Sequence, residues 1–110
     1  MNEQVKKYLS DILFSIDCIQ EFVHDIDFNH YIKDLKTKSA VERQLGIVGE
    51  AISKLEKITK EVSLQYTRQI IGMRNRIIHA YDSVDDEVIW AIVRKYLPEL
   101  KEEIEKLLNI

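Results

Sequence analysis

The sequence predicts an all-α fold, and two observations carry this prediction. Only three Gly and one Pro occur among 110 residues, which is too few for a sheet with frequent turns. Hydrophobic residues make up 45% of the chain and charged residues 32%, and the apolar ones recur at three- and four-residue intervals, as on amphipathic helices. We therefore expect one domain over residues 1–110, built as a bundle of four to five helices.

The first predicted helix begins near Val5 and carries two apolar lines. The main line lies on one stripe at about 100° per residue and comprises Val5, Leu9, Ile12, Leu13, Ile16, Ile19 and Val23. A second, weaker line comprises Phe14, Cys18 and Phe22. Two apolar lines on one helix indicate that it packs against two surfaces. One is the core, and the other is a further helix or a second subunit. Because a chain this short leaves much apolar surface wet as a monomer, we expect a homodimer.

The middle of the chain predicts a short turn and then a long helix. Residues 25–29 interrupt the first helix, and Asp27 is a plausible cap for the turn that follows. Strict helical spacing then runs over residues 37–58, through Val41, Leu45, Val48, Ile52 and Leu55. Gly46 and Gly49 inside this helix each cost about 1 kcal/mol relative to Ala. We therefore expect a neighbouring helix to cross closely there.

Two more helices are predicted in the C-terminal half. Ser63 is expected to cap the first, whose buried line is Ile70, Met73 and Ile77. The second should start near Asp85, after a cluster of acids suited to a helix N-terminus. Its buried residues are expected to be Trp90, Val93, Leu97, Leu100, Ile104 and Leu107. Pro98 should kink this helix, since its ring removes an amide donor and crowds the preceding turn.

The charge distribution singles out one segment. The net charge of −3 argues against a general nucleic-acid binder. Residues 64–81, however, contain Arg68, Arg74 and Arg76 and no acid, whereas the segments on either side carry an excess of acids. This is the only basic part of the chain, and a phosphate-containing ligand would be attracted to it.

The basic segment ends in Arg74-Asn75-Arg76-Ile77-Ile78-His79-Ala80-Tyr81, whose side chains suit phosphate chemistry. The planar guanidinium of Arg74 matches phosphate oxygens. His79 can take and give a proton near neutral pH. Asn75 lies four residues before His79 and so on its face, where its amide could orient the ring or a substrate.

One copy of the chain does not direct both groups at a single point. Arg74 and His79 are five residues apart, about 140° around an ideal helix. If two copies pair about a two-fold axis, two arginines and two histidines enter one cleft. Such a cleft is sufficient for attack of an RNA 2′-hydroxyl on its own 3′-phosphate, with no metal.

Other kinds of site find little support in the sequence. Glu21 and His24 have the three-residue spacing of ferritin-like iron sites, but that architecture needs a second such pair and two further glutamates. Cys18 is the single cysteine and has no zinc-site partners, and no glycine-rich phosphate loop occurs. No metal and no cofactor are therefore expected. The chain begins without a signal-peptide pattern and lacks a run of about 18 apolar residues, so we expect a cytoplasmic protein with no membrane partner.

The chain resembles HepT-like toxins of the HEPN superfamily. The resemblance rests on the arginine, histidine and tyrosine at 74, 79 and 81 and on segments that span most of the chain. These segments are Asp11-Ile12-Leu13, Leu45-Gly46-Ile47-Val48-Gly49-Glu50-Ala51, Ile71-Gly72-Met73-Arg74-Asn75, Trp90 and Leu97-Pro98-Glu99-Leu100. One departure is Tyr66, which stands where the family's tryptophan is expected.

The resemblance implies a dimeric HEPN-type helical bundle that acts as a metal-independent endoribonuclease toxin. It implies that Arg74 and His79 are the catalytic pair, supported by Asn75 and Arg76, and that RNA is the substrate. It further implies a minimal nucleotidyltransferase antitoxin as partner, which silences the toxin by transferring AMP to Tyr81. A bulky, negatively charged AMP group near His79 would obstruct the cleft that RNA phosphate enters.

Two other functions stay open from the sequence. The chain could be a HEPN nucleotide-binding or adaptor module without nuclease activity that still partners the nucleotidyltransferase. It could also be a structural dimeric bundle in which Arg74 and His79 pair with acids such as Glu50.

Overall fold

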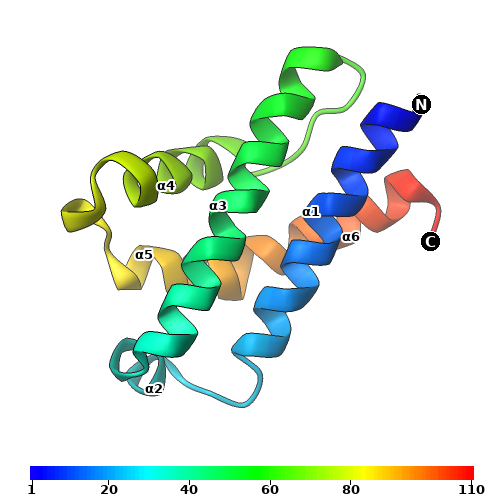
Figure 1. Ribbon diagram of the computed structural model, residues 1–110. Coiled ribbons are helices and arrows are strands. Elements are labelled where there is room, and N and C mark those ends of the chain that lie inside the picture. Colours follow the sequence, from blue (N-terminus) through cyan, green and yellow to red (C-terminus); the bar gives the residue numbers. More distant parts are fainter.

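The computed structural model describes residues 1–110 and consists of helices and the turns that join them (Figure 1). The all-α prediction is confirmed. The α-helices are α1 (Glu3–Phe22), α2 (Phe28–Lys33), α3 (Leu35–Ile58), α4 (Thr67–His79), α5 (Asp86–Ala91) and α6 (Leu97–Leu108). A 3-10 turn (η1, Tyr81–Ser83) follows α4, and a π-helical segment (η2, Ile92–Tyr96) joins α5 to α6. No helix has both the length and the apolar character that crossing a membrane requires.

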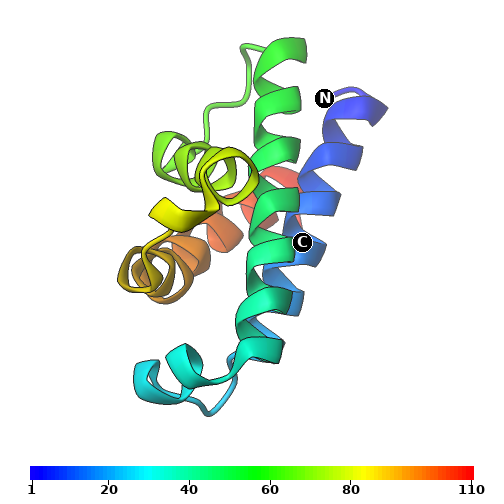
Figure 2. The same ribbon diagram turned by 60° about the vertical axis from the view of Figure 1, so that its left-hand side comes forward.

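The helices form two layers. The long helices α1 and α3 run antiparallel side by side, and α2 lies at the end where they are connected (Figure 1). Helix α4 and the rod made of α5, η2 and α6 lie on one side of this pair, as the rotated view shows (Figure 2). One face of the α1 and α3 pair is therefore left without a covering helix.

The core is formed by the apolar stripes that the spacing predicts. Helix α1 buries its main line except for Leu13, which is only partly covered, and α3 buries its own line in full. The second line of α1 is different: Phe14 and Phe22 are exposed and Cys18 is half-buried. Asp27 caps α2 as predicted, by accepting a 2.8 Å hydrogen bond from the backbone N–H of His30.

The start of α4 differs from the prediction. Ser63 is not the cap, because α4 begins only at Thr67, after Tyr66 in the left-handed backbone conformation (φ 64°). That conformation costs a residue with a Cβ about 1–2 kcal/mol. Tyr66 is held there by tertiary contacts: its ring stacks on Tyr96 at 4.3 Å, and its hydroxyl donates a 2.6 Å hydrogen bond to Glu99. Side-chain contacts with the C-terminal rod thus replace a local cap.

Helices α3 and α4 approach most closely at Gly49. A Cβ added to Gly49 would lie 2.6 Å from the Cβ of Arg74 and 3.3 Å from the backbone oxygen of Ile70. The predicted close crossing is therefore confirmed at Gly49. It is wrong at Gly46, where an added Cβ would have no neighbour within 4 Å.

The C-terminal rod starts near Asp85, as predicted, and its helix is irregular just before Pro98. Asp85 caps α5 through a 2.9 Å hydrogen bond from the Glu87 N–H. The five residues Ile92–Tyr96 then adopt π-helical geometry just before Pro98, which lies in the first turn of α6, where its missing N–H is least costly. Trp90 is half-buried and packs against Tyr31, with the two ring centroids 5.1 Å apart. Leu107 is exposed, contrary to expectation.

We predict that Gly49→Ala destabilises the fold by about 1–3 kcal/mol, the usual cost of forcing a methyl group into a filled site. The new methyl group would displace Arg74 and the α4 backbone from α3. Urea unfolding followed by circular dichroism measures the loss.

Gly46→Ala is the matched control on the same helix. It meets no neighbour, so it should raise the free energy of unfolding by up to about 1 kcal/mol, because Ala is the better helix former. Equal effects of the two substitutions would contradict a close crossing at Gly49.

Candidate functional site

An open groove of about 630 Å³ runs along α3 between α1 and α4. All three helices contribute residues to its lining. Its apolar lining includes Phe14 of α1, which is 68% exposed, and Ile78 of α4, which is 52% exposed. Its charged and polar lining comprises Lys7, Tyr8, Asp11, Ser15, Glu42, Arg43, Gln44, Glu50, Lys54 and Arg74.

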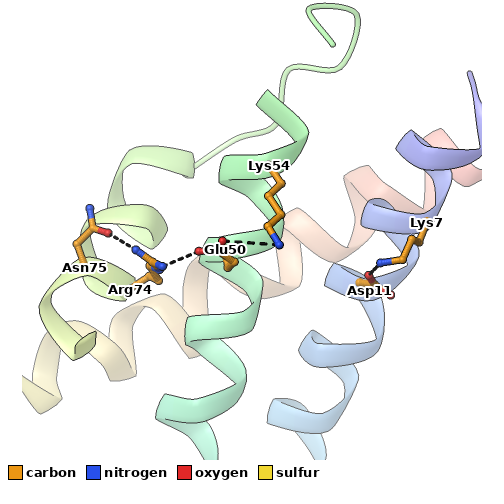
Figure 3. A network of polar contacts seen from close by, with 6 residues as sticks. All are labelled: Lys7, Asp11, Glu50, Lys54, Arg74 and Asn75. Atoms are coloured by element: carbon orange, nitrogen blue, oxygen red, sulfur yellow. Dashed lines mark hydrogen bonds and ion pairs between the residues drawn. The ribbon is translucent and has the colours of Figure 1, made fainter. Parts of the chain in front are cut away.

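Arg74 extends from α4 into this groove and is held by two neighbours (Figure 3). Its Nη2 lies 2.6 Å from Oε2 of Glu50 on α3, and its Nη1 donates a 2.9 Å hydrogen bond to Oδ1 of Asn75. The side chain is 25% exposed, and its buried Nε has no hydrogen-bond partner. Two contacts therefore orient the guanidinium, and a quarter of the side chain remains exposed.

Further charges extend along both walls of the groove (Figure 3). On α3, Nζ of Lys54 lies 3.9 Å from Oε1 of Glu50. On α1, Lys7 and Asp11 form an ion pair at 2.8 Å. Exposed pairs of this kind contribute little to stability, so their cations can be redirected toward an incoming anion at small cost.

His79 is not in the same place as Arg74. It is the last residue of α4, is exposed, and forms no hydrogen bond or ion pair with another side chain. It does not line the groove, although Ile77 and Ile78 just before it do. Within one copy of the chain the structure does not bring the Arg74 and His79 side chains to one point.

The other two residues of the motif helix are exposed. The Asn75 amide oxygen accepts from Arg74 rather than contacting His79, so in this structure Asn75 orients the arginine. Arg76 is exposed and makes no ion pair, as is Arg68 at the start of α4. Two cations of the basic segment are thus free for an anionic ligand.

Tyr81 lies just beyond α4, in the turn η1, and is 56% exposed. Its hydroxyl donates a 2.9 Å hydrogen bond to Oε1 of Glu42 on α3. That hydrogen bond, together with the negative charge of Glu42, raises the pKa of the Tyr81 phenol above its ordinary value. The accessible phenol of Tyr81 is therefore hydrogen-bonded to the buried carboxylate of Glu42.

Glu42 is a candidate site residue that the sequence pattern does not single out. It is only 6% exposed, and the Tyr81 hydroxyl is the one side-chain group that donates to it. A signal was available, because Glu42 shares the buried stripe of α3 with Leu45, Gly49 and Ile52. A carboxylate on such a stripe requires a partner from another element, but its spacing cannot identify the partner.

The candidate iron ligand His24 is an exposed residue beyond the end of α1, 3.2 Å from the carboxylate of Asp25. No group of three or more His, Cys, Asp and Glu side chains is arranged so that it could hold a metal ion.

Comparison with known proteins assigns the family. The family model described as ribonuclease HepT-like matches residues 12–107. The chain is 39% identical over 108 residues to "Probable ribonuclease HepT" of Thermococcus cleftensis, covering 97% of this chain and 98% of the relative. It is 35% identical over 109 residues to "Putative RNase MJ0125" of Methanocaldococcus jannaschii, covering 96% and 91% of the two chains.

A bacterial relative, "Putative RNase TTE0752" of Caldanaerobacter subterraneus, is 34% identical over 105 residues, covering 94% of each chain. No solved structure matches the chain at a comparable level of significance. The matches extend over nearly the whole chain and include α4, which carries Arg74 and His79, and η1, which carries Tyr81. The chain belongs to the HepT-like ribonuclease family.

Proposed function

We propose that the chain is a metal-independent endoribonuclease and the toxin of a toxin-antitoxin system. Two copies form a homodimer, and Arg74 and His79 act together at its interface, supported by Asn75 and Arg76. The 2′-hydroxyl of RNA attacks the adjacent phosphorus, so the product ends in a 2′,3′-cyclic phosphate. A minimal nucleotidyltransferase is the antitoxin, and it silences the toxin by transferring AMP to Tyr81.

The observation that carries this proposal is the position of Arg74 in the groove. Its guanidinium already binds one anion, the Glu50 carboxylate at 2.6 Å, and a phosphate oxygen can take the place of that carboxylate. Asn75 keeps the guanidinium oriented while the exchange occurs. A preoriented cation is suited to stabilise the charge that develops on phosphate in the transition state.

Two observations support a dimer. The groove exposes Phe14 and Ile78, apolar side chains that a second copy would cover. His79 lies at the end of α4, away from the groove that Arg74 lines, so pairing two α4 ends would bring the histidine of one copy toward the arginine of the other. Both requirements are met by one interface.

A second candidate function is favoured by one observation, the Arg74–Glu50 ion pair itself. In a structural or adaptor bundle without nuclease activity, this pair would serve only to join α4 to α3. The two functions differ in whether the wild-type protein cleaves RNA at all and in whether a folded Arg74→Ala variant has lost that cleavage.

We predict that light scattering reports about twice 13.0 kDa in solution. Phe14→Asp should shift the mass toward the monomer, because it places a charge on the apolar surface that the second copy covers. Leu35→Asp is the control, since Leu35 is equally exposed but lies at the start of α3, outside the groove. A monomeric wild-type protein at micromolar concentration would exclude the composite site.

We predict that Arg74→Ala and His79→Ala each lower the rate of RNA cleavage by about 10² or more, the usual scale for losing an acid-base or charge-stabilising group. Cleavage should persist in EDTA and leave 2′,3′-cyclic phosphate ends. Lys36→Ala is the control and should cleave like the wild type, because Lys36 is an exposed cation of α3 that lies outside both the groove and the basic segment.

Mixing the two inactive variants tests the composite site directly. A mixed dimer of Arg74→Ala and His79→Ala keeps one arginine and one histidine in the cleft, so it should recover part of the activity that each variant lacks. If neither substitution slows cleavage, or if EDTA abolishes it, the proposed mechanism is wrong.

We predict that AMP is transferred to Tyr81 when the protein is co-expressed with its proposed partner, a minimal nucleotidyltransferase. The phenol is the most accessible tyrosine side chain of the motif region and lies two residues from His79. Peptide mass spectrometry should find the added AMP on Tyr81, and Tyr81→Phe should escape silencing while retaining some cleavage.

Tyr66→Phe is the matched control, because Tyr66 also donates its hydroxyl proton to a glutamate but lies at the opposite end of α4. It should be silenced like the wild type. If AMP is found on another tyrosine, or Tyr81→Phe is still silenced, control depends on binding of the antitoxin alone.

A further inference from the structure

The Tyr81 phenol and the Glu42 carboxylate form an isolated pair. The 2.9 Å hydrogen bond from the phenol to Oε1 joins residues 39 positions apart, so it exists only because α4 and η1 fold back onto α3. Glu42 is 6% exposed, forms no ion pair, and accepts from no other side chain. Tyr81, in contrast, exposes more than half of its surface.

Few other polar side chains surround this pair. None of them takes the place of Tyr81 as hydrogen-bond donor or of Glu42 as acceptor. Lys38, one turn before Glu42 on α3, is engaged at 2.8 Å by Asp86 of α5. Tyr31 of α2 is fully buried, and its hydroxyl has no hydrogen-bond partner. Burial, followed by the charges of Glu42 and Asp86, raises the pKa of the Tyr31 phenol, so Tyr31 remains a neutral neighbour.

Tyr81 cannot act as a nucleophile without losing its proton. The pKa of its phenol is raised above the ordinary value of about 10, chiefly by the hydrogen bond to Glu42, so phenolate is scarce near neutral pH. A neutral phenol can still attack if a base removes its proton as the new bond forms. The group already in hydrogen-bond contact with that proton is Glu42.

We propose that Glu42 is the general base for transfer of AMP to Tyr81, an inference that rests on the modification proposed above. The phenolic oxygen of Tyr81 forms a bond to the α-phosphorus of ATP. The bond from that phosphorus to the oxygen bridging to the β-phosphate breaks, and pyrophosphate leaves. The phenolic proton passes to Oε1 of Glu42. The substrate protein thus supplies a catalytic residue for its own modification.

The surroundings of Glu42 favour this direction of proton transfer. As the phenolic oxygen bonds to phosphorus, it can no longer donate to the carboxylate. Glu42 would then be a charge with little solvent and no donor, a costly state that taking the proton relieves. The hydrogen bond that holds the phenol in place before transfer is therefore also the path of its proton.

The test compares single-turnover AMP transfer to the wild type and to Glu42→Gln, using the proposed partner nucleotidyltransferase and Mg-ATP. The amide keeps the shape of the side chain but cannot take a proton, so the rate near pH 7 should fall by about 10². Glu42→Asp keeps a carboxylate and should retain more of the rate. Glu56→Gln, an exposed position on the same helix, should react like the wild type.

The ratio of wild-type to Glu42→Gln rates at each pH separates a base from a merely positioning residue. The variant depends on phenolate, whose fraction increases about tenfold per pH unit as long as the pH stays below the pKa of the phenol. The wild-type rate does not depend on phenolate, because Glu42 removes the proton. The ratio of the wild-type rate to the Glu42→Gln rate should therefore be largest at low pH and fall as the pH rises from 7 to 9. Because titration of the partner enzyme affects both proteins alike, it cancels in the ratio.

Each outcome decides the inference. A pH-independent ratio, or equal rates, with the wild type labelled on Tyr81 would overturn the role of Glu42 and leave the proposed silencing intact. A wild type that acquires no AMP on Tyr81 would overturn both. If Glu42→Gln fails to fold by circular dichroism, Glu42→Asp decides: a rate lowered by the same factor at pH 7 and at pH 9 would mark Glu42 as a positioning residue and overturn the proposal.

Discussion

The contact between α3 and α4 at Gly49 is the constraint on which the candidate site depends. Because residue 49 has no side chain, α4 lies close enough for the Arg74 guanidinium to meet Glu50, the next residue of α3. The same approach lets Tyr81 meet Glu42, eight residues earlier and about 12 Å away along α3. Two carboxylates of α3 therefore set the positions of the site residues. Glu50 positions Arg74, the proposed phosphate-binding residue, and Glu42 positions Tyr81, the proposed modification site.

The two carboxylates perform different tasks because they differ in exposure. Glu50 is half-exposed and shares its charge between Arg74 and Lys54, so an incoming phosphate can displace it from Arg74 at modest cost. Glu42 is buried and has a single donor, so its charge responds strongly to any change at Tyr81. Ligand exchange is suited to the first site, and proton transfer to the second.

The sequence could predict those features that repeat with the period of a helix. Apolar spacing located the long helices and their buried lines, because burial follows helical periodicity. It did not distinguish Gly46 from Gly49, since only the crossing of α4 makes them different. Ser63 was wrong as a cap because contacts with the distant C-terminal rod hold Tyr66 in a conformation that no local signal favours. The partner of Glu42 was hidden for the same reason: it comes from another part of the chain.

Helix α4 is attached at its two ends by bonds of the same kind but unequal strength. At the start, Tyr66 is held by ring stacking on Tyr96 as well as by its hydrogen bond to Glu99. At the end, Tyr81 is held to α3 by one hydrogen bond from an exposed phenol. Breaking that bond would remove the side-chain hydrogen bond that ties η1 to α3, whereas the crossing at Gly49 and the ion pair between Arg74 and Glu50 would still hold α4 in place. Chemistry on the phenolic oxygen of Tyr81 would therefore act on the turn that follows His79, at the end of α4 with the weaker side-chain attachment.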